Sequence, residues 1–410
     1  MRYTLNDDVD ILKSFDKKSA RTFNKQTKVG YSLNEDAIRI LEEVLSSTSQ
    51  SGDNNLITAA KYFCDIGLLK ESRCESKSPI HSIRVVKAAK QLKKLQIELT
   101  QKCNLRCIHC YMSETTHYLH SMNFNWLISL IDQAYDLGVE EISLTGGETL
   151  SYRHFKEVVS YISSKRFSLR IYTNGTLLRP KTVQFLKDQR VEHVKVSVDG
   201  GTKETHESIR GKGTFKSLIN GLDLLKEAGI PIEITSVLHQ LNDSESELMA
   251  QLAKKYGAQH FTDVFSKTGN IDQDKNLSIS PERFVNSLDY KMKLIKEVPN
   301  PHFTSYCGFG ESYLYVNAMG YPQLCPALTL LPEYQLPNIF QTSLKEVWER
   351  ITKQTAPQCK FFSTCKYAGY CGGGCRANAL LNGGSIDGPD EYSCAIYKSL
   401  ESRGVKLGKE

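Results

Sequence analysis

From about residue 95 to 266 the chain alternates regularly between short β-branched runs and amphipathic helical patterns. The predicted strands are Leu95–Thr100, Ile142–Thr145, Leu169–Thr173, Val194–Val198, Ile232–Leu238 and His260–Phe265. Helical patterns such as FNWLISLIDQAYDLG lie between them, and several end at a glycine, a common helix stop. Six strands alternating with helices predict a parallel sheet with right-handed crossovers, either a doubly wound layer or a partial barrel. In both arrangements the active site lies at the carboxyl ends of the strands.

Length and composition exclude several classes of protein. The 410 residues exceed what one core usually holds, so we expect more than one domain. No run of about 18 apolar residues occurs, so no membrane span is expected. The first residues are acidic rather than basic and apolar, which predicts a cytoplasmic, reducing location. The net charge of +6 is too small to indicate nucleic-acid binding by itself.

The 12 cysteines fall into two groups separated by almost 200 residues without any. The first group is Cys103, Cys107 and Cys110, in LTQKCNLRCIHCY directly after the first predicted strand. The second group consists of Cys307, Cys325, Cys359, Cys365, Cys371, Cys375 and Cys394. Cys64 and Cys74 stand apart, and Cys64 is interpreted as a core residue of a helix. In a reducing compartment, clustered cysteines more often bind metal than form disulfides.

The C-x3-C-x2-C spacing of the first group favours an iron–sulfur cluster. Three thiolates of one loop can hold three irons of a cubane and leave the fourth without a protein ligand. The alternative is zinc, which normally has four ligands. His109 could be the fourth ligand, but it lies between two of the cysteines.

This loop, placed after the first strand of a repeating βα domain, resembles that of the radical S-adenosylmethionine (SAM) enzymes. The resemblance implies a partial (β/α)6 barrel whose cluster binds SAM and cleaves it to a 5′-deoxyadenosyl radical. Further strand-end segments resemble the family's SAM-contacting motifs: SLTGGETL, YTNGTLL and VSVDGGTKETHESIRGKGTF. They imply SAM-binding roles for Gly146, Gly147, Glu148, Thr173, Asn174, Ser197, Asp199 and Arg210. For Ser197 and Asp199 ordinary strand-end capping is the alternative, and no general acid or base is predicted.

The second cysteine group resembles the seven-cysteine SPASM extension of radical SAM enzymes, which holds two auxiliary [4Fe–4S] clusters. The segment Cys359-x5-Cys365 departs from the usual x2 spacing, whereas YCGGGC and C-x12-G-x4-C match closely. By resemblance one cluster is held by Cys359, Cys365, Cys371 and Cys394. The other is held by Cys307, Cys325 and Cys375, which leaves an open iron that could bind a substrate thiolate or accept an electron. A zinc ribbon is less consistent, because seven cysteines divide poorly into four-ligand sites.

The first 75 residues predict a separate unit. Two short strand patterns, Arg21–Asn24 and Val29–Leu33, precede the helical patterns DAIRILEEVLSS and LITAAKYFCDIGLL. This order resembles the winged-helix-like element by which ribosomal-peptide modification enzymes bind a leader peptide as an added strand. A basic stripe would favour an acidic leader; it consists of Lys13, Lys17, Lys18, Arg21, Lys25 and Lys28. DNA binding is less consistent, because the unit has 11 basic and 12 acidic residues.

The sequence therefore predicts four segments: a leader-recognition unit (1–75), a basic connector (76–94), a radical SAM partial barrel (95–290) and an iron–sulfur-stapled SPASM domain (291–410). Together they most resemble the sactipeptide maturases, which form sulfur-to-α-carbon thioethers in a precursor peptide. The implied cofactors are SAM and three [4Fe–4S] clusters, and the implied partners are the precursor peptide and an electron donor such as flavodoxin or ferredoxin. Alternatives are a peptide epimerase, a carbon–carbon crosslinking maturase, a sulfatase-maturase-type oxidase, and a non-enzymatic iron–sulfur regulator.

Overall fold

The computed structural model describes residues 2–5, 9–13, 19–24, 30–46, 54–66, 68–72, 83–85, 91–110, 119–165, 167–266, 277–298, 307–354 and 356–407. Cys74 and much of the predicted connector lie outside these residues, and so do the side chains of the basic stripe. In the described part, no helix is both long and apolar enough to cross a bilayer.

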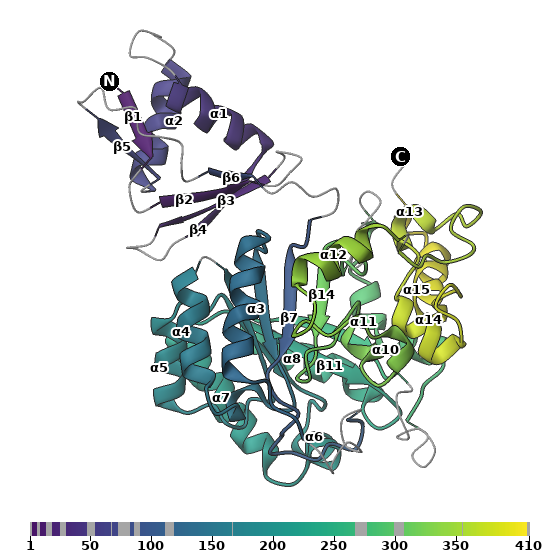
Figure 1. Cartoon of the computed structure of the whole chain (residues 1–410). Coiled ribbons are helices and arrows are strands. Elements are labelled where there is room, and N and C mark those ends of the chain that lie inside the picture. The colour runs from purple at the N-terminus through teal and green to yellow at the C-terminus, as the bar shows by residue number, and fades with distance from the viewer. Residues whose placement is uncertain are drawn as a thin grey trace.

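The N-terminal residues form a small unit of strands and two helices (Figure 1). Its main sheet has the order β4-β3-β2-β6. The strands are β2 (Val9–Lys13), β3 (Ser19–Asn24), β4 (Gly30–Asn34) and β6 (Ile83–Val85), and a second pair joins β1 (Arg2–Leu5) to β5 (Leu69–Ser72). The helices α1 (Glu35–Ser46) and α2 (Asn54–Asp65) pack around a separate apolar core that includes Ile38, Leu41 and Phe63.

The sequence predicted β3, β4 and both helices of this unit to within a few residues. It did not predict β1, β2, β5 and β6, because runs of three to five residues such as IRV show too little periodicity. β6 lies inside the segment predicted as a connector, and it pairs in parallel with β2. The N-terminal unit therefore extends to residue 85. β4 is an edge strand of its sheet, since β3 is its only described partner.

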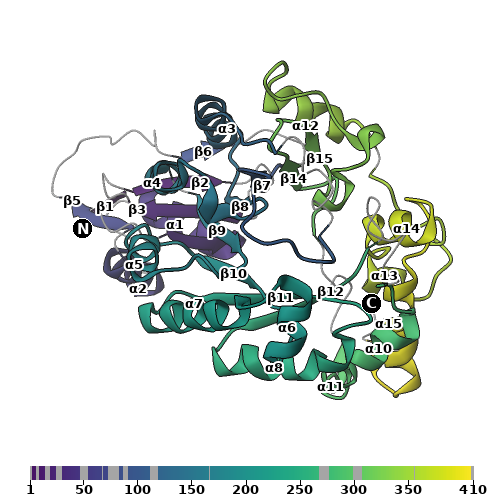
Figure 2. The ribbon, with the colours of Figure 1, turned by 90° about the horizontal axis from the view of Figure 1, so that it is seen from below.

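The predicted βα alternation is present as a parallel sheet. Its strands are β7 (Lys94–Glu98), β8 (Glu141–Thr145), β9 (Ser168–Thr173), β10 (His193–Ser197), β11 (Ile232–Leu238) and β12 (Gln259–Val264). The crossover helices are α3 (Phe124–Asp136), α4 (Phe155–Lys165), α5 (Pro180–Asp188), α6 (Lys203–Arg210), α7 (Thr214–Ala228) and α8 (Ser246–Lys255). The strands form an arc with these helices outside it (Figure 2), so the sheet is a partial barrel and not a doubly wound layer.

The two faces of this sheet differ sharply in polarity. Residues such as Leu95, Ile171 and Ile234 point toward the helices and belong to the main apolar core. The alternate residues are polar and include Gln96, Glu98, Glu141, Ser143, Arg170, Lys195, Ser197, Glu233 and Asp263, brought side by side by the strand register. A parallel sheet covered on both faces would be apolar on both. The polar face therefore lines the inside of the open barrel.

Asp263 illustrates the nature of this inner space. Asp263 has solvent-accessible surface. Nevertheless, the protein that surrounds its carboxyl group reduces solvation of the charge and raises its pKa. The two observations agree if the side chain faces an internal space that is open to solvent but enclosed by protein. Lys195 lies on the same face, with its ammonium 4.4 Å from the centre of the Phe261 ring.

The C-terminal part continues the same sheet. β14 (Tyr313–Val316) pairs in parallel with β7, and β15 (Pro322–Gln323) pairs antiparallel with β14. The remaining elements are α10 (Pro281–Ser287), α11 (Asp289–Met292), β13 (Glu297–Val298), α12 (Leu344–Thr352), α13 (Ala368–Cys371), α14 (Arg376–Gly383), α15 (Glu391–Ser402) and β16 (Lys406–Leu407), with short 3₁₀ turns between them. This part closes the open side of the barrel arc in Figure 2.

Arg170 offers a test of the inner face. Its guanidinium lies 2.7 Å from Glu233 Oε1 and 3.2 Å from Glu141 Oε2. Arg170→Met should leave both carboxylates without their cation and lower the free energy of unfolding by about 3 kcal/mol. Thermal unfolding of the purified chain would show this as a fall of several degrees, partly reversed in the Arg170→Met/Glu233→Gln variant. An unchanged midpoint would show that solvent, and not Arg170, stabilises these acids.

Candidate functional site

The cysteine loop begins directly after β7 and is held from several sides. Cys107 is buried, whereas Cys103 and Cys110 are partly exposed. The Ile108 N–H donates to the carbonyl of Ile209 at the end of α6 (3.0 Å). Asn174, after β9, donates from Nδ2 to Asn104 Oδ1 (3.0 Å) and lies 3.9 Å from Cys103 Sγ. The loop is thus fixed by β9 and α6 as well as by its own strand.

Burial raises the pKa of the Cys107 thiol to about 11 and also raises that of Cys103. Metal ligands are thiolates, so loading of metal at this loop must release protons. No three His, Cys, Asp or Glu side chains of the described residues are spaced for a single metal ion. The assignment of a cluster to Cys103, Cys107 and Cys110 therefore remains a prediction from their residue type and spacing.

Gly146 and Gly147 bring the end of β8 into contact with the start of this loop. The Gly147 N–H donates to Thr100 O (2.7 Å), and the next N–H, of Glu148, donates to Lys102 O (2.8 Å). A Cβ on Gly147 would lie 2.5 Å from Lys102 O, and one on Gly146 would lie 2.5 Å from Thr100 O. Only glycine allows the two backbones to approach this closely.

Glu148 is 1% exposed and binds protein donors with both carboxylate oxygens. Oε1 accepts from Leu150 N (3.0 Å) and Thr173 Oγ1 (2.7 Å), and Oε2 accepts from Asn174 N (2.8 Å). Burial raises the pKa of this carboxyl, and the donated hydrogen bonds oppose that shift. Glu148 therefore joins the ends of β8 and β9, and a contact of its carboxylate with SAM remains a prediction.

Thr173 and Asn174 belong to the same network. Asn174 Oδ1 accepts from Thr176 N (2.9 Å), and Thr176 Oγ1 accepts from Asn104 Nδ2 (2.9 Å). Sequence reasoning missed Asn104 and Thr176, although the asparagine in each of the segments CNLRC and TNGT was a signal of a polar turn. Thus most of the polar side chains at this rim hydrogen-bond to other protein groups and hold the strand ends in place.

Asp199 and Arg210 form a buried ion pair beside the loop. Arg210 Nε donates to Asp199 Oδ2 at 2.6 Å, and His109 Nε2 lies 3.3 Å from the same oxygen. Although burial alone would raise it, the neighbouring Arg210 guanidinium holds the pKa of Asp199 at about 2. Burial lowers the pKa of His109 to about 4. Ser197 precedes this pair on the inner face of β10 and is half-buried.

Sequence reasoning did not assign the histidines of this region. His206 Nδ1 accepts from Asp199 N (3.4 Å), and the rings of His109 and His239 lie 5.5 Å apart. Each of these three histidines has one buried ring nitrogen without a hydrogen-bond partner among the described residues. The motif THESIRG contained one of them, but nothing in a single sequence linked it to residues near 109 or 239.

The C-terminal thiols fall into two sets by their mutual electrostatic influence. Burial raises the pKa of Cys325, and Cys375 and Cys307 raise it further. Burial likewise raises the pKa of Cys371 to about 12, with contributions from Cys394 and Cys365. Cys359 and Cys365 in turn contribute to the raised pKa of Cys394, after burial. The SPASM resemblance groups the same cysteines, and their assignment to two clusters remains a prediction.

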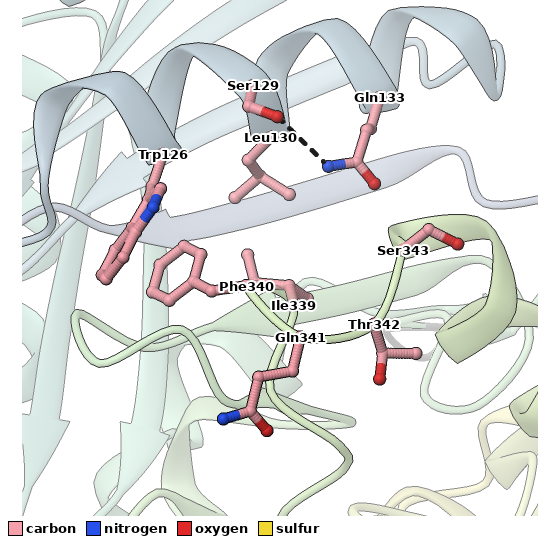
Figure 3. A pocket seen from close by; sticks show the side chains of 9 residues that line it. All are labelled: Trp126, Ser129, Leu130, Gln133, Ile339, Phe340, Gln341, Thr342 and Ser343. Carbon is pink, nitrogen blue, oxygen red and sulfur yellow. Dashed lines mark hydrogen bonds between the residues drawn. The ribbon is translucent and has the colours of Figure 1, made fainter.

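A pocket of about 360 Å³ lies between α3 and the segment before α12 (Figure 3). The Trp126 ring stacks on Phe340 with ring centres 4.0 Å apart, and Gln133, Thr342 and Ser343 line the other side of the pocket. Its lining contains no cysteine and no charged side chain. This pocket therefore lacks the chemistry found at the carboxyl ends of the strands.

Residues 97–253, which contain the cysteine loop, the glycine contact and the Asp199–Arg210 pair, match the family model "Radical SAM superfamily". Residues 97–253 of this chain therefore form a radical SAM domain. The family binds SAM and a [4Fe–4S] cluster, and the thiols of the cysteine loop and the glycines at the end of β8 fit such groups.

Relatives and solved structures extend this match beyond the radical SAM domain. The antilisterial bacteriocin subtilosin biosynthesis protein AlbA of Bacillus subtilis is 28% identical over 298 residues, which is 67% of this chain and 65% of AlbA. The AdoMet-dependent heme synthase of Methanosarcina barkeri is 27% identical over 342 residues, 73% of this chain and 95% of that protein. This chain thus spans just under two thirds of the length of AlbA.

A solved structure resembles almost the whole chain. Streptococcus suis SuiB bound to its precursor peptide SuiA superposes with a TM-score of 0.64 at 16% identity, covering 96% of this chain and 99% of SuiB. At this identity the likeness shows a shared fold. It includes the N-terminal unit and the C-terminal part as well as the radical SAM barrel.

The glycine contact with the cysteine loop can be tested directly. Gly147→Ala should overpack the junction of β8 with the loop and cost about 1–3 kcal/mol of stability. The control is Gly383→Ala in α14, where the nearest atom to an added Cβ is 3.7 Å away. We expect a lower midpoint of thermal unfolding and weaker SAM binding only for Gly147→Ala. Equal behaviour of the two variants would contradict the close approach described above.

Proposed function

We propose that this radical SAM enzyme is a peptide maturase that forms sulfur-to-α-carbon thioethers in a ribosomally made precursor. The proposal depends on the combination of three parts in one chain. They are an N-terminal unit with the edge strand β4, a radical SAM barrel and a C-terminal part with two sets of thiols. The match to AlbA, a bacteriocin biosynthesis protein, and to SuiB, solved with its precursor peptide, supports a peptide substrate.

The proposed roles follow from position. Cys103, Cys107 and Cys110 hold a [4Fe–4S] cluster, which when bound supplies one-electron reduction of SAM, as in the family. The strand-end backbone at Gly146 and Gly147 provides the surface against which SAM lies. Glu148, Thr173 and Asn174 keep this surface rigid, since each hydrogen-bonds to a neighbouring strand end. The polar inner face of the barrel holds the target residue of the peptide away from bulk water.

The two C-terminal sets of thiols are proposed to hold the auxiliary clusters. Four cysteines would close one cluster, whereas Cys307, Cys325 and Cys375 would leave an open position on the other. Asp263, on the inner face of the barrel, contributes to the raised pKa of Cys325 after burial and the two thiols of its set. This influence supports a position of the proposed open iron toward the barrel interior, where a substrate cysteine thiolate could reach it.

The N-terminal unit is proposed to bind the leader of the precursor. Strand β4 has one edge without a described partner, so a peptide can add to it through main-chain hydrogen bonds. An electron donor such as flavodoxin or ferredoxin would reduce the clusters. No partner nucleic acid is proposed.

Other chemistries of the same architecture are the main alternatives. A peptide epimerase and a carbon–carbon crosslinking maturase would use the same three parts. A sulfatase-maturase-type oxidase would need no N-terminal unit, and the presence of that unit favours a leader-dependent enzyme. The match to a heme synthase, over 73% of this chain, does not by itself favour a peptide substrate.

Anaerobic co-expression with short cysteine-containing open reading frames from the gene's neighbourhood tests the thioether proposal. We expect a peptide that loses two hydrogens per crosslink, with tandem mass spectrometry placing the bond between a cysteine and an α-carbon. The Cys103→Ala/Cys107→Ala/Cys110→Ala variant is the control; it should abolish SAM cleavage and retain about eight of about 12 irons. A peptide of unchanged mass that contains a D-residue would instead establish the epimerase.

The edge strand can be tested with two neighbouring prolines. In β4 consecutive N–H groups point in opposite directions, so one of Tyr31 and Ser32 donates toward β3 and the other toward the free edge. Tyr31→Pro and Ser32→Pro should therefore differ. One removes a hydrogen bond to β3 and destabilises the N-terminal unit. The other leaves the circular dichroism unchanged but weakens binding of the unmodified precursor at least tenfold. SAM cleavage without peptide should persist in both. Unchanged binding in both variants would place the leader elsewhere.

A further inference from the structure

A buried group of charged and titratable side chains lies directly against the cysteine loop, and its members are Asp199, Arg210, His109, His206 and His239. Asp199 is fully buried and Arg210 is 9% exposed. The group is joined to the loop by backbone, because Ile108 N donates to the carbonyl of Ile209, the residue before Arg210 (3.0 Å). It is joined also through His109, which lies between two of the loop cysteines.

Each oxygen of Asp199 already contacts a protein group. Its Oδ2 accepts from Arg210 Nε (2.6 Å) and lies 3.3 Å from His109 Nε2. Its Oδ1 accepts from the backbone N–H of Val237 on β11 (2.9 Å). Even its carbonyl oxygen accepts, from Asn242 Nδ2 (3.1 Å). These contacts and the absence of exposed surface on Asp199 favour a role within the protein over a direct contact with SAM.

The Arg210 side chain is anchored through Nε. Within the described part of the chain its hydrogen bonds involve Nε alone, and this nitrogen faces Asp199. A guanidinium is planar, so an anchored Nε fixes the direction of the two terminal nitrogens. The Asp199 oxygen that accepts from Nε also lies 3.3 Å from His109 Nε2, so the guanidinium lies beside the cysteine loop.

We propose that Asp199 is a positioning residue that aims the Arg210 guanidinium at the cysteine loop, where its charge offsets that of the three ligating thiolates. The proposal rests on the cluster assignment of the proposed function. Three thiolates make such a cluster anionic, and reduction adds one further negative charge. A fixed cation next to it therefore favours the reduced form that the chemistry requires.

The alternative role for Arg210 is a direct contact with the carboxylate of SAM. The two roles predict different measurements. A charge that acts on the cluster shifts its reduction potential in the absence of SAM. A residue that only contacts SAM changes the affinity for SAM and leaves the SAM-free potential unchanged.

Redox titration of the anaerobically reconstituted full chain without SAM, followed by EPR, tests the proposal. The triple alanine variant of the loop cysteines supplies the background from clusters bound elsewhere. We expect Arg210→Met to lower the ratio of reduced to oxidised loop cluster at the wild-type midpoint at least tenfold, equivalent to about 59 mV for a one-electron couple. Arg210→Lys should recover most of this loss. Lys212→Met, which removes an exposed charge two residues away, should change the ratio less than twofold.

Asp199→Asn separates positioning from simple charge. Loss of a negative charge would by itself raise the potential, whereas release of Arg210 from the loop lowers it. Under the proposal the second effect is the larger, so the potential should fall. Arg210→Met alone leaves the buried Asp199 charge unpaired and could fail to fold. The double variant Asp199→Asn/Arg210→Met removes both charges and avoids this. The reduction potential of the double variant should be no lower than that of Arg210→Met. A rise in Asp199→Asn, or an unchanged potential with weaker SAM binding in Arg210→Met, overturns the proposal. If the triple variant loses no iron relative to wild type, the cluster assignment itself has failed.

Discussion

The backbone hydrogen bonds between the end of β8 and the start of the cysteine loop determine where the site is. They require two consecutive residues without a side chain, because a Cβ at Gly146 or Gly147 would meet a carbonyl oxygen at 2.5 Å. Once this junction is made, the Glu148 carboxylate ties β9 to the same place. Three strand ends then converge, and the loop that carries the thiols lies over them.

The inner face of the barrel is polar for a related reason. A reactive site inside a sheet needs groups that hold a substrate, and these groups must be stable before the substrate arrives. Arg170 meets this need by pairing with Glu141 and Glu233 across neighbouring strands. Lys195 lies near the ring of Phe261, and its charge opposes the rise in the pKa of Asp263 that burial causes. Charges that neutralise one another in this way allow a solvated interior within a stable parallel sheet.

The sequence predicted the fold best where a regular pattern of strands and helices continues over many residues. The strands from β7 to β12 were predicted within one or two residues, because β-branched runs alternate with helices over about 170 residues. The short strands of the N-terminal unit and the addition of β14 to β7 were not, since both depend on pairing between distant segments. The same limit applied to the site. The cysteines and glycines were visible as motifs, whereas the contact of Asp199 with Arg210 and His109 exists only after α6 and the cysteine loop have folded together.

The proposed separation of leader recognition from chemistry also explains why the barrel interior needs little affinity of its own. A peptide bound by its main chain at β4 reaches the barrel as a tethered segment, so its target residue is present at a high effective concentration. Main-chain recognition at an edge strand is tolerant of side-chain identity, and specificity can then come from the leader and from the spacing to the target. Under this arrangement the site residues are free to serve the radical chemistry. A buried Asp199–Arg210 pair next to the thiols is consistent with such a division of roles.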